Sequence, residues 1–344
     1  MKLILDAMGG DNAPRANIYG AVQFAKESKT EVVLVGKKEI ITEILNEALT
    51  EMKISKLKNI SIVDAREEIL MEDIPTKAIK GKKDSSMVVG LNMVKADEKG
   101  EDVFISAGNT GALLTGATLL VGRIKGIIRP AIATTLPAVK GEYVLIDSGA
   151  NTNCKEENFM QFAQMASIYL KLTKKQTNPT VGLLNIGTED TKGNELYKSV
   201  FQYMKENAEE NNINFIGNIE GRTPFKGGVD IVVSDGFVGN VFLKTIEGVG
   251  KMLKANLKEL GDSLGMKKVL LFPMKKDLLA FANRMDYKRY GGGLFLGIKN
   301  PIVKAHGSAD QTSFYFTLKQ AEVFGNSGIT QEITREILKE KRGE

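Results

Sequence analysis

Residues 221–244, GRTPFKGGVDIVVSDGFVGNVFLK, contain in one stretch the elements from which the rest of the chain is built. Asp230–Val233 is a short apolar run rich in β-branched residues, which is typical of a strand buried on both faces. A Ser-Asp-Gly turn ends this run, and a helical pattern follows. In open α/β sheets, ligands bind beyond the carboxyl ends of the strands, where helix N-termini point toward them. We therefore expect Asp235, Asn240 and Lys244 near a binding site, although a helix cap explains Asp235 equally well.

Strands and helices alternate along the rest of the chain in the same way. Short apolar runs are followed by helical patterns of roughly 10 to 20 residues, which indicates a largely parallel sheet with helices on both faces. We predict an α/β fold, a three-layer α/β/α unit that forms one domain over residues 1–344. The predicted strands are 2–6, 31–36, 60–64, 102–106, 131–135, 143–147, 180–185, 214–217, 230–233 and 302–305.

The composition is that of an ordinary globular protein, because 42% of the residues are hydrophobic and 26% are charged. Cys154 is the only cysteine, and the N-terminus has no secretory signal pattern, so we expect a cytoplasmic protein without disulfides. No apolar run approaches the roughly 20 residues that a membrane-spanning helix needs. The sequence therefore does not predict a membrane span.

The positive charge is concentrated in one segment. Residues 251–290 carry ten Lys or Arg and four Asp or Glu, a net charge of +6, whereas the whole chain has +5. We predict a basic helical hairpin over residues 250–290, with helices at 251–264 and 274–289 and an apolar tip at Val269–Phe272. Such a hairpin is either a pair of core-packed helices with solvated lysines or a surface for an anionic membrane or an acidic protein.

Six predicted strands end in loops rich in Gly, Asn, Ser or Asp. The loops read DAMGGD, SAGNTGA, DSGANTN, NIGTED, NIEGR and SDGFVGN. In a parallel sheet they would meet at one edge and form an anion site, because glycine lets the backbone approach a ligand and helix dipoles favour negative charge. One such loop is as well explained by a structural turn, but six of them favour a ligand site.

Motifs for other chemistries are missing. The chain has neither G-x-G-x-x-G nor G-x-x-x-x-G-K-[ST], which disfavours the common nucleotide sites. It has no G-x-S-x-G elbow, one histidine, His306, and no His or Cys spacing typical of metal ligands. A helix start after Cys154 would favour the thiolate form of this residue, but nothing else in the sequence marks it as a nucleophile.

The same loops carry a family resemblance. The shared motifs are DAMGGD (6–11) with AP (13–14), KKDSS (82–86), SAGNTGA (106–112), RPAIA (129–133), DSGAN (147–151), LLNIGTE (183–189), DGFVGNVFLK (235–244) and HGS (306–308). Over residues 1 to about 325, the chain resembles the bacterial phosphate acyltransferase (PlsX) family of phospholipid synthesis. Asn12 stands where many members have His, so no role is carried over to it.

The resemblance implies the activity and the partners. Such enzymes transfer a fatty acyl group from acyl carrier protein to inorganic phosphate, and the acyl phosphate then serves phosphatidic acid synthesis. Members are similar in fold to phosphotransacetylases and to isocitrate and isopropylmalate dehydrogenases. The resemblance also implies a homodimer on the membrane surface, no cofactor and no metal, and a membrane glycerol-3-phosphate acyltransferase that receives the product. No nucleic acid partner is expected, because aromatic residues do not interleave with the basic ones.

Matched loops and helix starts supply the candidate site residues. The candidate catalytic residues are Asn109, Asp235, Asn240, Lys244 and His306. The candidate phosphate-binding residues are Gly9, Gly10, Asp11, Lys83, Ser86, Thr110, Gly111, Arg129, Asn185 and Gly236. Among them, the cations would neutralise phosphate, and the amides would orient it.

These residue types suit phosphate as a nucleophile. Phosphate is already anionic near pH 7, and a thiol with a pKa of about 8.5 leaves without a strong acid. What remains is to position the reactants and to stabilise the developing oxyanion. Two alternatives stay open: a metal-dependent 2-hydroxyacid dehydrogenase on the same kind of fold, and a non-catalytic sensor of acyl groups or phosphate.

Overall fold

A single mixed sheet runs through the protein in the computed structural model, which describes residues 1–263, residue 276 and residues 287–340. In these ranges the strands are β1 Lys2–Asp6, β2 Glu31–Gly36, β3 Ile60–Asp64, β4 Val103–Ser106, β5 Ala131–Pro137, β6 Glu142–Ile146, β7 Thr180–Asn185, β8 Asn214–Glu220, β9 Ile231–Val233, β10 Gly293–Leu296 and β11 Ile302–Lys304. Their order across the sheet is β3-β2-β1-β4-β11-β10-β5-β6-β9-β7-β8.

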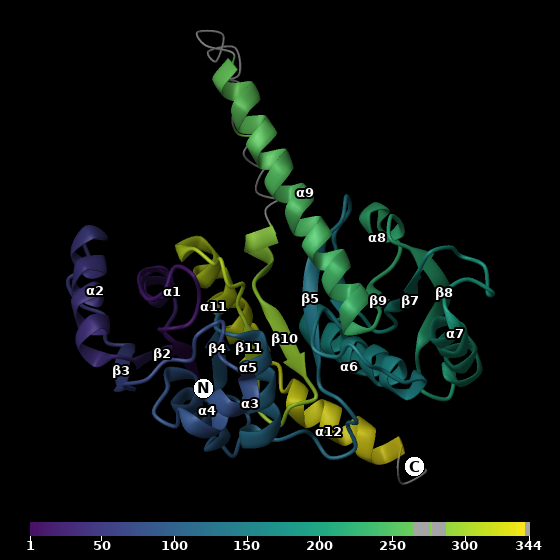
Figure 1. Cartoon of the computed structure of the whole chain (residues 1–344), viewed down its shortest axis with the longest axis horizontal. Coiled ribbons are helices and arrows are strands. Elements are labelled where there is room, and N and C mark those ends of the chain that lie inside the picture. Colours follow the sequence, from purple (N-terminus) through teal and green to yellow (C-terminus); the bar gives the residue numbers. More distant parts are fainter. Residues whose placement is uncertain (264–275, 277–286, 341–344) are drawn as a thin grey trace.

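Helices cover both faces of this sheet (Figure 1). They are α1 Arg15–Glu27, α2 Lys38–Glu51, α3 Pro75–Gly81, α4 Ser86–Lys95, α5 Thr110–Gly116, α6 Glu156–Lys174, α7 Glu195–Asn207, α8 Thr223–Lys226, α9 Gly236–Ser263, α11 Gln311–Asn326 and α12 Ile329–Glu340, with short turns η1 Ala117–Val121 and η3 Tyr287–Tyr290. Residues of α1, α6, α7, α11 and α12 join one hydrophobic cluster, whereas residues of α4 and α5 join another. The layers are therefore helix, sheet and helix, as the sequence predicts.

The strand directions divide the sheet into two halves. β1 is parallel to β2 and β4, and β11 is parallel to β4. β5 and β6 pair antiparallel, and β6, β9, β7 and β8 are parallel to one another. Our prediction that all six glycine-rich loops meet at one edge is therefore wrong, because the carboxyl ends of β6, β7, β8 and β9 point to the edge opposite that of β1 and β4.

Helix α9 crosses from one edge toward the other and then projects from the body (Figure 1). Its first turn follows β9, and Leu243 packs in a third cluster with Leu145 and Val232. In the described residues it is one continuous helix over 236–263, so the predicted helix at 251–264 is the second half of α9 rather than a separate element. The predicted apolar tip and most of the second helix of the hairpin lie outside the described residues.

None of the helices within residues 1–263 and 287–340 is both long and apolar enough to cross a membrane.

Candidate active site

A row of polar positions crosses five adjacent strands on the face that α4, α5 and α9 cover. Ser106 Oγ at the end of β4 donates a hydrogen bond of 2.7 Å to Asp6 Oδ2 at the end of β1. Lys304 at the end of β11 lies in register with Ser106 on one side and Gly293 of β10 on the other. A Cβ atom at Gly293 would lie 3.3 Å from Thr134 Oγ1 of β5. Because Gly293 has no side chain, none stands between Lys304 and Thr134 in this row.

Lys304 is the cation at the centre of this row. Its Nζ donates to the carbonyl oxygens of Ala107 at 3.1 Å and Ala305 at 2.6 Å, so it joins the loops after β4 and β11. Burial, together with the positive charge of Lys244, lowers the pKa of Lys304 to about 8, against the opposing effect of Asp6 and other carboxylates. The ammonium group therefore remains mostly charged at pH 7, but an additional anion beside it would be stabilising.

Helix α9 brings a buried carboxylate to the same place. Glu247 is only 6% exposed. Its side chain accepts hydrogen bonds from Lys244 Nζ at 3.0 and 3.1 Å, and its Oε1 lies 3.3 Å from Nδ1 of His306. We call Lys244, Glu247, Lys304 and His306 the basic cluster. It combines residues from α9 with the end of β11.

His306 is neutral in this environment. Burial lowers the pKa of His306 to about 4, and nearby Lys244, Lys304 and Lys251 act in the same direction, whereas Glu247 opposes them. A neutral imidazole carries one proton, and its contact with the Glu247 carboxylate places that proton on Nδ1. Nε2 is then a hydrogen-bond acceptor, so the cluster combines cations with a neutral acceptor nitrogen.

Glycines allow the loops around the basic cluster to approach one another. A Cβ at Gly9 would lie 2.6 Å from Asp6 Oδ2 and 2.8 Å from the backbone nitrogen of Gly108. Gly10 has a φ of +113°, which side-chain-bearing residues rarely adopt, and the backbone nitrogen of Asp11 donates to Gly307 O at 2.8 Å. The loops after β1, β4 and β11 therefore form one packed group at the same edge.

The structure brings seven predicted phosphate-site and catalytic residues to this edge besides Lys244 and His306. They are Gly9, Gly10, Asp11, Ser86, Asn109, Thr110 and Gly111. Ser86 is buried and is one of the hydrogen-bond partners of Asp6. Asn109 caps α5 through Ala112 N at 3.0 Å, and its amide nitrogen contacts Met71 O at 2.8 Å and Asp73 O at 3.2 Å. The side chain of Asn109 is thus engaged in holding the loop before α3.

Other predicted residues lie at the opposite edge, where β6, β7 and β9 end. Asp235 accepts hydrogen bonds from Tyr197 Oη at 2.6 Å and from Phe237 N and Val238 N at 2.8 and 3.0 Å, so it caps α9. The backbone nitrogen of Gly236 donates to Asn151 O at 2.7 Å. Both residues hold the start of α9 in the body.

Three further predicted residues belong to that opposite edge. Nδ2 of Asn185 donates hydrogen bonds to Lys192 O at 3.1 Å and to Asn218 Oδ1 at 3.0 Å. Arg129 is exposed and contributes to the electrostatics of buried Cys154, whose pKa burial raises to about 12. Asn240 is exposed and lies against Gly149; along α9 it is about 10 Å from Glu247. Asn240 is the one of these three residues that lies on α9, the helix that continues to the basic cluster.

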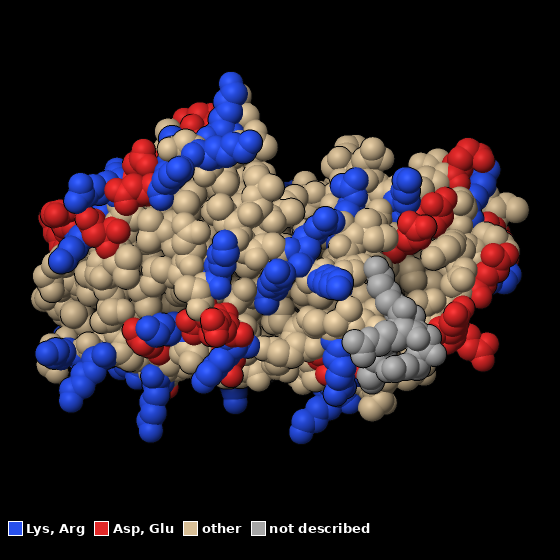
Figure 2. Space-filling model, turned by 90° about the horizontal axis from the view of Figure 1, so that it is seen from below, with Lys and Arg blue, Asp and Glu red and all other residues tan. Residues whose placement is uncertain are grey.

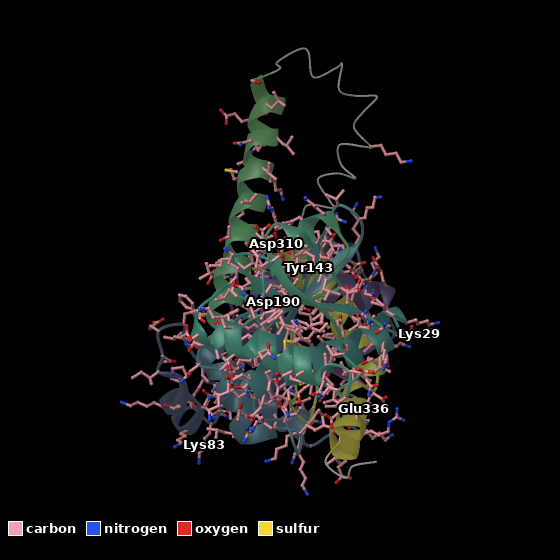
Figure 3. All side chains as sticks on the ribbon, turned by 90° about the vertical axis from the view of Figure 1, so that its right-hand side faces the viewer. Lys29, Lys83, Tyr143, Asp190, Asp310 and Glu336 are labelled. Atoms are coloured by element: carbon pink, nitrogen blue, oxygen red, sulfur yellow. The ribbon has the colours of Figure 1, made fainter. Side chains whose placement is uncertain are left out.

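Lys83 lies apart from both groups. It is exposed, and in Figure 3 it stands at the lower edge of the body, far from Asp310, which follows His306 by four residues. Lysine and arginine side chains are also spread over the face drawn in Figure 2, among Asp and Glu. Five cations outside the two groups line an open hollow near the amino ends of β4 and β11: Lys95, Lys99, Lys125, Lys299 and Arg335. These cations are exposed to water, as Lys244 is, whereas Lys304 is largely enclosed by the protein.

Sequence reasoning missed Lys304 and Glu247. Lys304 interrupts the apolar strand Ile302–Ala305, and a lysine inside such a run is a signal for a buried charge. Glu247 follows Lys244 by three residues on a helix, a spacing typical of solvated pairs as well, so the sequence alone does not distinguish it.

Known proteins resemble this chain over its whole length. The family model described as "Fatty acid synthesis protein" matches residues 1–332. A protein of Caldicellulosiruptor bescii named phosphate acyltransferase is 45% identical over 342 residues and covers 99% of each chain.

The fold also matches solved structures at low sequence identity. A phosphotransacetylase from Streptococcus pyogenes has a TM-score of 0.60 at 13% identity and covers 94% of both chains. A protein from Salmonella typhimurium described as a 4-hydroxythreonine-4-phosphate dehydrogenase has a TM-score of 0.50 at 11% identity and covers 94% of this chain and 98% of that one. These likenesses confirm the predicted dehydrogenase-like α/β fold, and at such identities they show the fold alone.

Proposed function

This chain belongs to the fatty acid synthesis protein family, in which its relative from Caldicellulosiruptor bescii is named a phosphate acyltransferase, and from this premise we propose its reaction. It transfers a fatty acyl group from the thioester of acyl carrier protein to inorganic phosphate. The products are an acyl phosphate for phosphatidic acid synthesis and the free thiol of the carrier. The observation that carries the proposal is the basic cluster at the joined ends of β1, β4 and β11.

The basic cluster supplies what a phosphate nucleophile needs. Lys244 and Lys304 lie near Glu247, and the pKa of Lys304 is lowered although Asp6 and Asp11 are also nearby, so its charge is incompletely stabilised and a further anion beside it is favoured. Gly10 and Gly307 let the backbone come close to that anion. In our proposal, these groups hold phosphate so that an anionic oxygen faces the thioester carbon. The enzyme then gains rate by fixing two reactants in place rather than by creating a stronger nucleophile.

The same cations stabilise the charge that develops during transfer. When the phosphate oxygen attacks, the carbonyl oxygen becomes negative, and the thiolate leaves when this intermediate collapses. We assign this stabilisation to Lys304 and Lys244. Nε2 of His306 accepts a hydrogen bond from the phosphate hydroxyl and so orients it, because an imidazole with a pKa of about 4 does not take up that proton; the departing thiolate receives it. Glu247 acts as a positioning residue because it fixes the tautomer of the imidazole.

The other predicted catalytic residues take supporting roles in this proposal. Asp235 and Asn109 are positioning residues, because the bonds they accept and donate hold α9 and the loop before α3. Asn240 is exposed on α9, and we propose that its amide contacts the donor rather than phosphate. Phosphate is thus held chiefly by the group of loops that contains Gly10, Asp11 and Gly307.

We also propose the remaining partners on sequence and shape. The protein acts as a single catalytic unit over residues 1–344, as a homodimer that docks peripherally on membranes, where a glycerol-3-phosphate acyltransferase receives the product. The projecting half of α9 supports membrane docking, because it exposes Val249, Met252 and Leu260 beside lysines. Replacing Lys267, Lys268, Lys275 and Lys276 by Glu should abolish sedimentation with anionic vesicles, and unchanged sedimentation would refute the docking proposal.

The reaction is tested by mixing acyl carrier protein thioester with phosphate. The expected result is thiol release together with an equal amount of acyl phosphate, trapped as a hydroxamate by hydroxylamine. Thiol release without trappable product would indicate a hydrolase and overturn the proposal. Saturable binding without either product would favour the sensor. Reduction of a nicotinamide cofactor with a 2-hydroxyacid would favour the dehydrogenase.

A further inference from the structure

An exposed apolar loop adjoins the basic cluster. Leu70, Met71 and Ile74 are 43%, 53% and 56% exposed, although they lie within five residues of one another. Ile69, directly before them, is buried in the cluster under α4 and α5. We call residues 70–74 the apolar loop. Adjacent large apolar side chains on a folded surface are typical of a place where something apolar binds.

Polar groups of the protein hold the apolar loop in this orientation. Asn109 Nδ2 donates to Met71 O at 2.8 Å and to Asp73 O at 3.2 Å, and Leu70 N donates to Asp73 Oδ2 at 2.8 Å. Lys82 forms an ion pair with Asp73 and lowers the pKa of that carboxyl group. The backbone of the loop is thus bonded inward, while its apolar side chains face outward. A surface ordered in this way is ready for a ligand without further ordering cost.

The apolar loop touches the loop that carries His306. A Cβ atom at Gly307 would lie 4.0 Å from Cε of Met71 and 3.9 Å from both carboxylate oxygens of Asp11. On the side of the cluster that faces α9, Lys244 and Lys251 are close enough to lower the pKa of His306. An apolar chain attached to a carbon at this cluster therefore meets cations toward α9 and apolar side chains toward Met71.

We infer that the apolar loop binds the hydrocarbon chain of the acyl donor, with Leu70, Met71 and Ile74 in contact with its methylene groups. The inference rests on the proposed function, because it requires a fatty acyl group whose carbonyl lies at the basic cluster. The chain leaves the cluster past Gly307 and lies along the loop. Because each methylene that leaves water contributes about fourfold to affinity, the loop makes the enzyme prefer long acyl chains.

The test compares acyl chains of different length in one double variant, Met71→Gln with Ile74→Gln. Synthetic S-butyryl, S-octanoyl and S-dodecanoyl pantetheine serve as donors, so that contacts with a carrier protein are absent. We expect kcat/KM for the dodecanoyl donor to fall about tenfold or more, while the value for the butyryl donor stays within about twofold. Leu119→Gln is the matched control, because Leu119 is 58% exposed and lies on η1, away from the loop.

Each other outcome overturns the inference. It fails if all donors lose activity equally, if none does, or if Leu119→Gln shows the same dependence on chain length. A change from dimer to monomer in the double variant, measured by light scattering, with chain-length preference unchanged, would assign the loop to a second copy of the chain. If the wild-type protein forms no trappable acyl phosphate from acyl carrier protein thioester or from any of these donors, the proposed function fails, and the inference falls with it.

Discussion

The two edges of the sheet look alike in sequence and differ in how their polar groups are used. Where β6 ends, Asp147 accepts hydrogen bonds from the backbone nitrogens of Ile132, Gly149, Ala150 and Asn151 at 2.7–3.1 Å. Where β11 ends, Lys304 and His306 meet Glu247 and Lys244 of a helix that begins at the other edge. Local bonds satisfy the first group, whereas distant elements assemble the second.

This difference separates structural loops from a chemical site. A carboxylate saturated by backbone N–H groups holds its own loop in shape and has little capacity left for a ligand. In the basic cluster, Lys244 and His306 both contact Glu247, Lys304 lies nearby, and the pKa values of His306 and Lys304 are lowered. Glycine and asparagine content alone does not reveal which of the two cases applies, because both kinds of loop need a backbone free to turn.

The largest expected effect tests whether the lysine at the β11 edge binds phosphate. Lys304→Met keeps the length and apolar stem of the side chain but removes its charge. We expect kcat/KM for phosphate to fall by about a hundred- to a thousandfold, as when one preorganised donor to a developing charge is lost. The KM for the acyl donor should change little. Initial rates at varied phosphate measure both values.

Lys83→Met is the matched control for that experiment. Lys83 was predicted from the sequence to bind phosphate, but it is exposed and far from the loop after His306 (Figure 3). We expect its removal to leave kcat/KM for phosphate within about twofold. An equal loss in both variants would show that the comparison between the edges does not locate the phosphate site.

A second prediction concerns stability at acid pH and the same edge. The pKa of His306 is about 4 in the folded protein, below the ordinary value of 6.5. Between these values the unfolded chain binds a proton and the folded chain does not, so stability falls as the pH is lowered from 6.5 to 4. The loss attributable to His306 is up to about 3 kcal/mol.

His306→Gln removes this contribution, and His306 is the single histidine of the chain. Urea unfolding at several pH values should therefore give a shallower fall in the variant between pH 6.5 and 4. Carboxylates such as Asp6, whose pKa burial raises, titrate in both proteins and cancel in the difference. Parallel curves would contradict a buried neutral imidazole.

The comparison also shows which parts of the fold the sequence predicts. The strands at 31–36, 60–64 and 180–185 agree with β2, β3 and β7, because continuous apolar runs bounded by turn residues are strong local signals. The reversal at β5 and β6 was missed. Four residues connect these strands, and Gly141 among them has a φ of +81°. So short a connection fits a hairpin and excludes the crossover that parallel strands need.

The site was predictable only in part. Lys244 and His306 follow from matched motifs, and the structure places both in the basic cluster. Glu247 depends on the path of α9 across the sheet, which no local pattern encodes. Asn109 and Asp235 have the residue types of a phosphate site, but their hydrogen bonds are directed to the protein. Side-chain direction is set by tertiary packing, and for that reason a motif does not tell a cap from a ligand.

A third prediction addresses the β9 edge. The sequence makes Asp235 a candidate catalytic residue, but the structure predicts that its replacement lowers stability. Asp235→Ala removes the cap of α9 and leaves the buried hydroxyl of Tyr197 without its carboxylate, which should cost about 2 kcal/mol. Urea unfolding measures this, with Tyr197→Phe as the smaller matched change. A stable variant with a hundredfold lower turnover would restore a chemical role for Asp235.

The smallest expected effect tests how the helix from one edge tunes the site at the other. Lys304, with a pKa of about 8, is surrounded by Lys244 and Glu247 of α9, Asp6 of β1 and Asp11 of the following turn. Glu247 favours its charged form, so Glu247→Gln should lower the pKa of Lys304, and Lys304 should lose its proton at a lower pH. Activity on phosphate should therefore begin to decline at a lower pH than in the wild type, and at pH 8 the variant should be about two- to fivefold less active.

Glu259→Gln is the control, because it neutralises a carboxylate farther along the exposed part of the same helix, and it should leave the pH profile unchanged. If both variants keep the wild-type profile, Glu247 does not couple the two edges, and the charge on Lys304 is set by its own strand and loop.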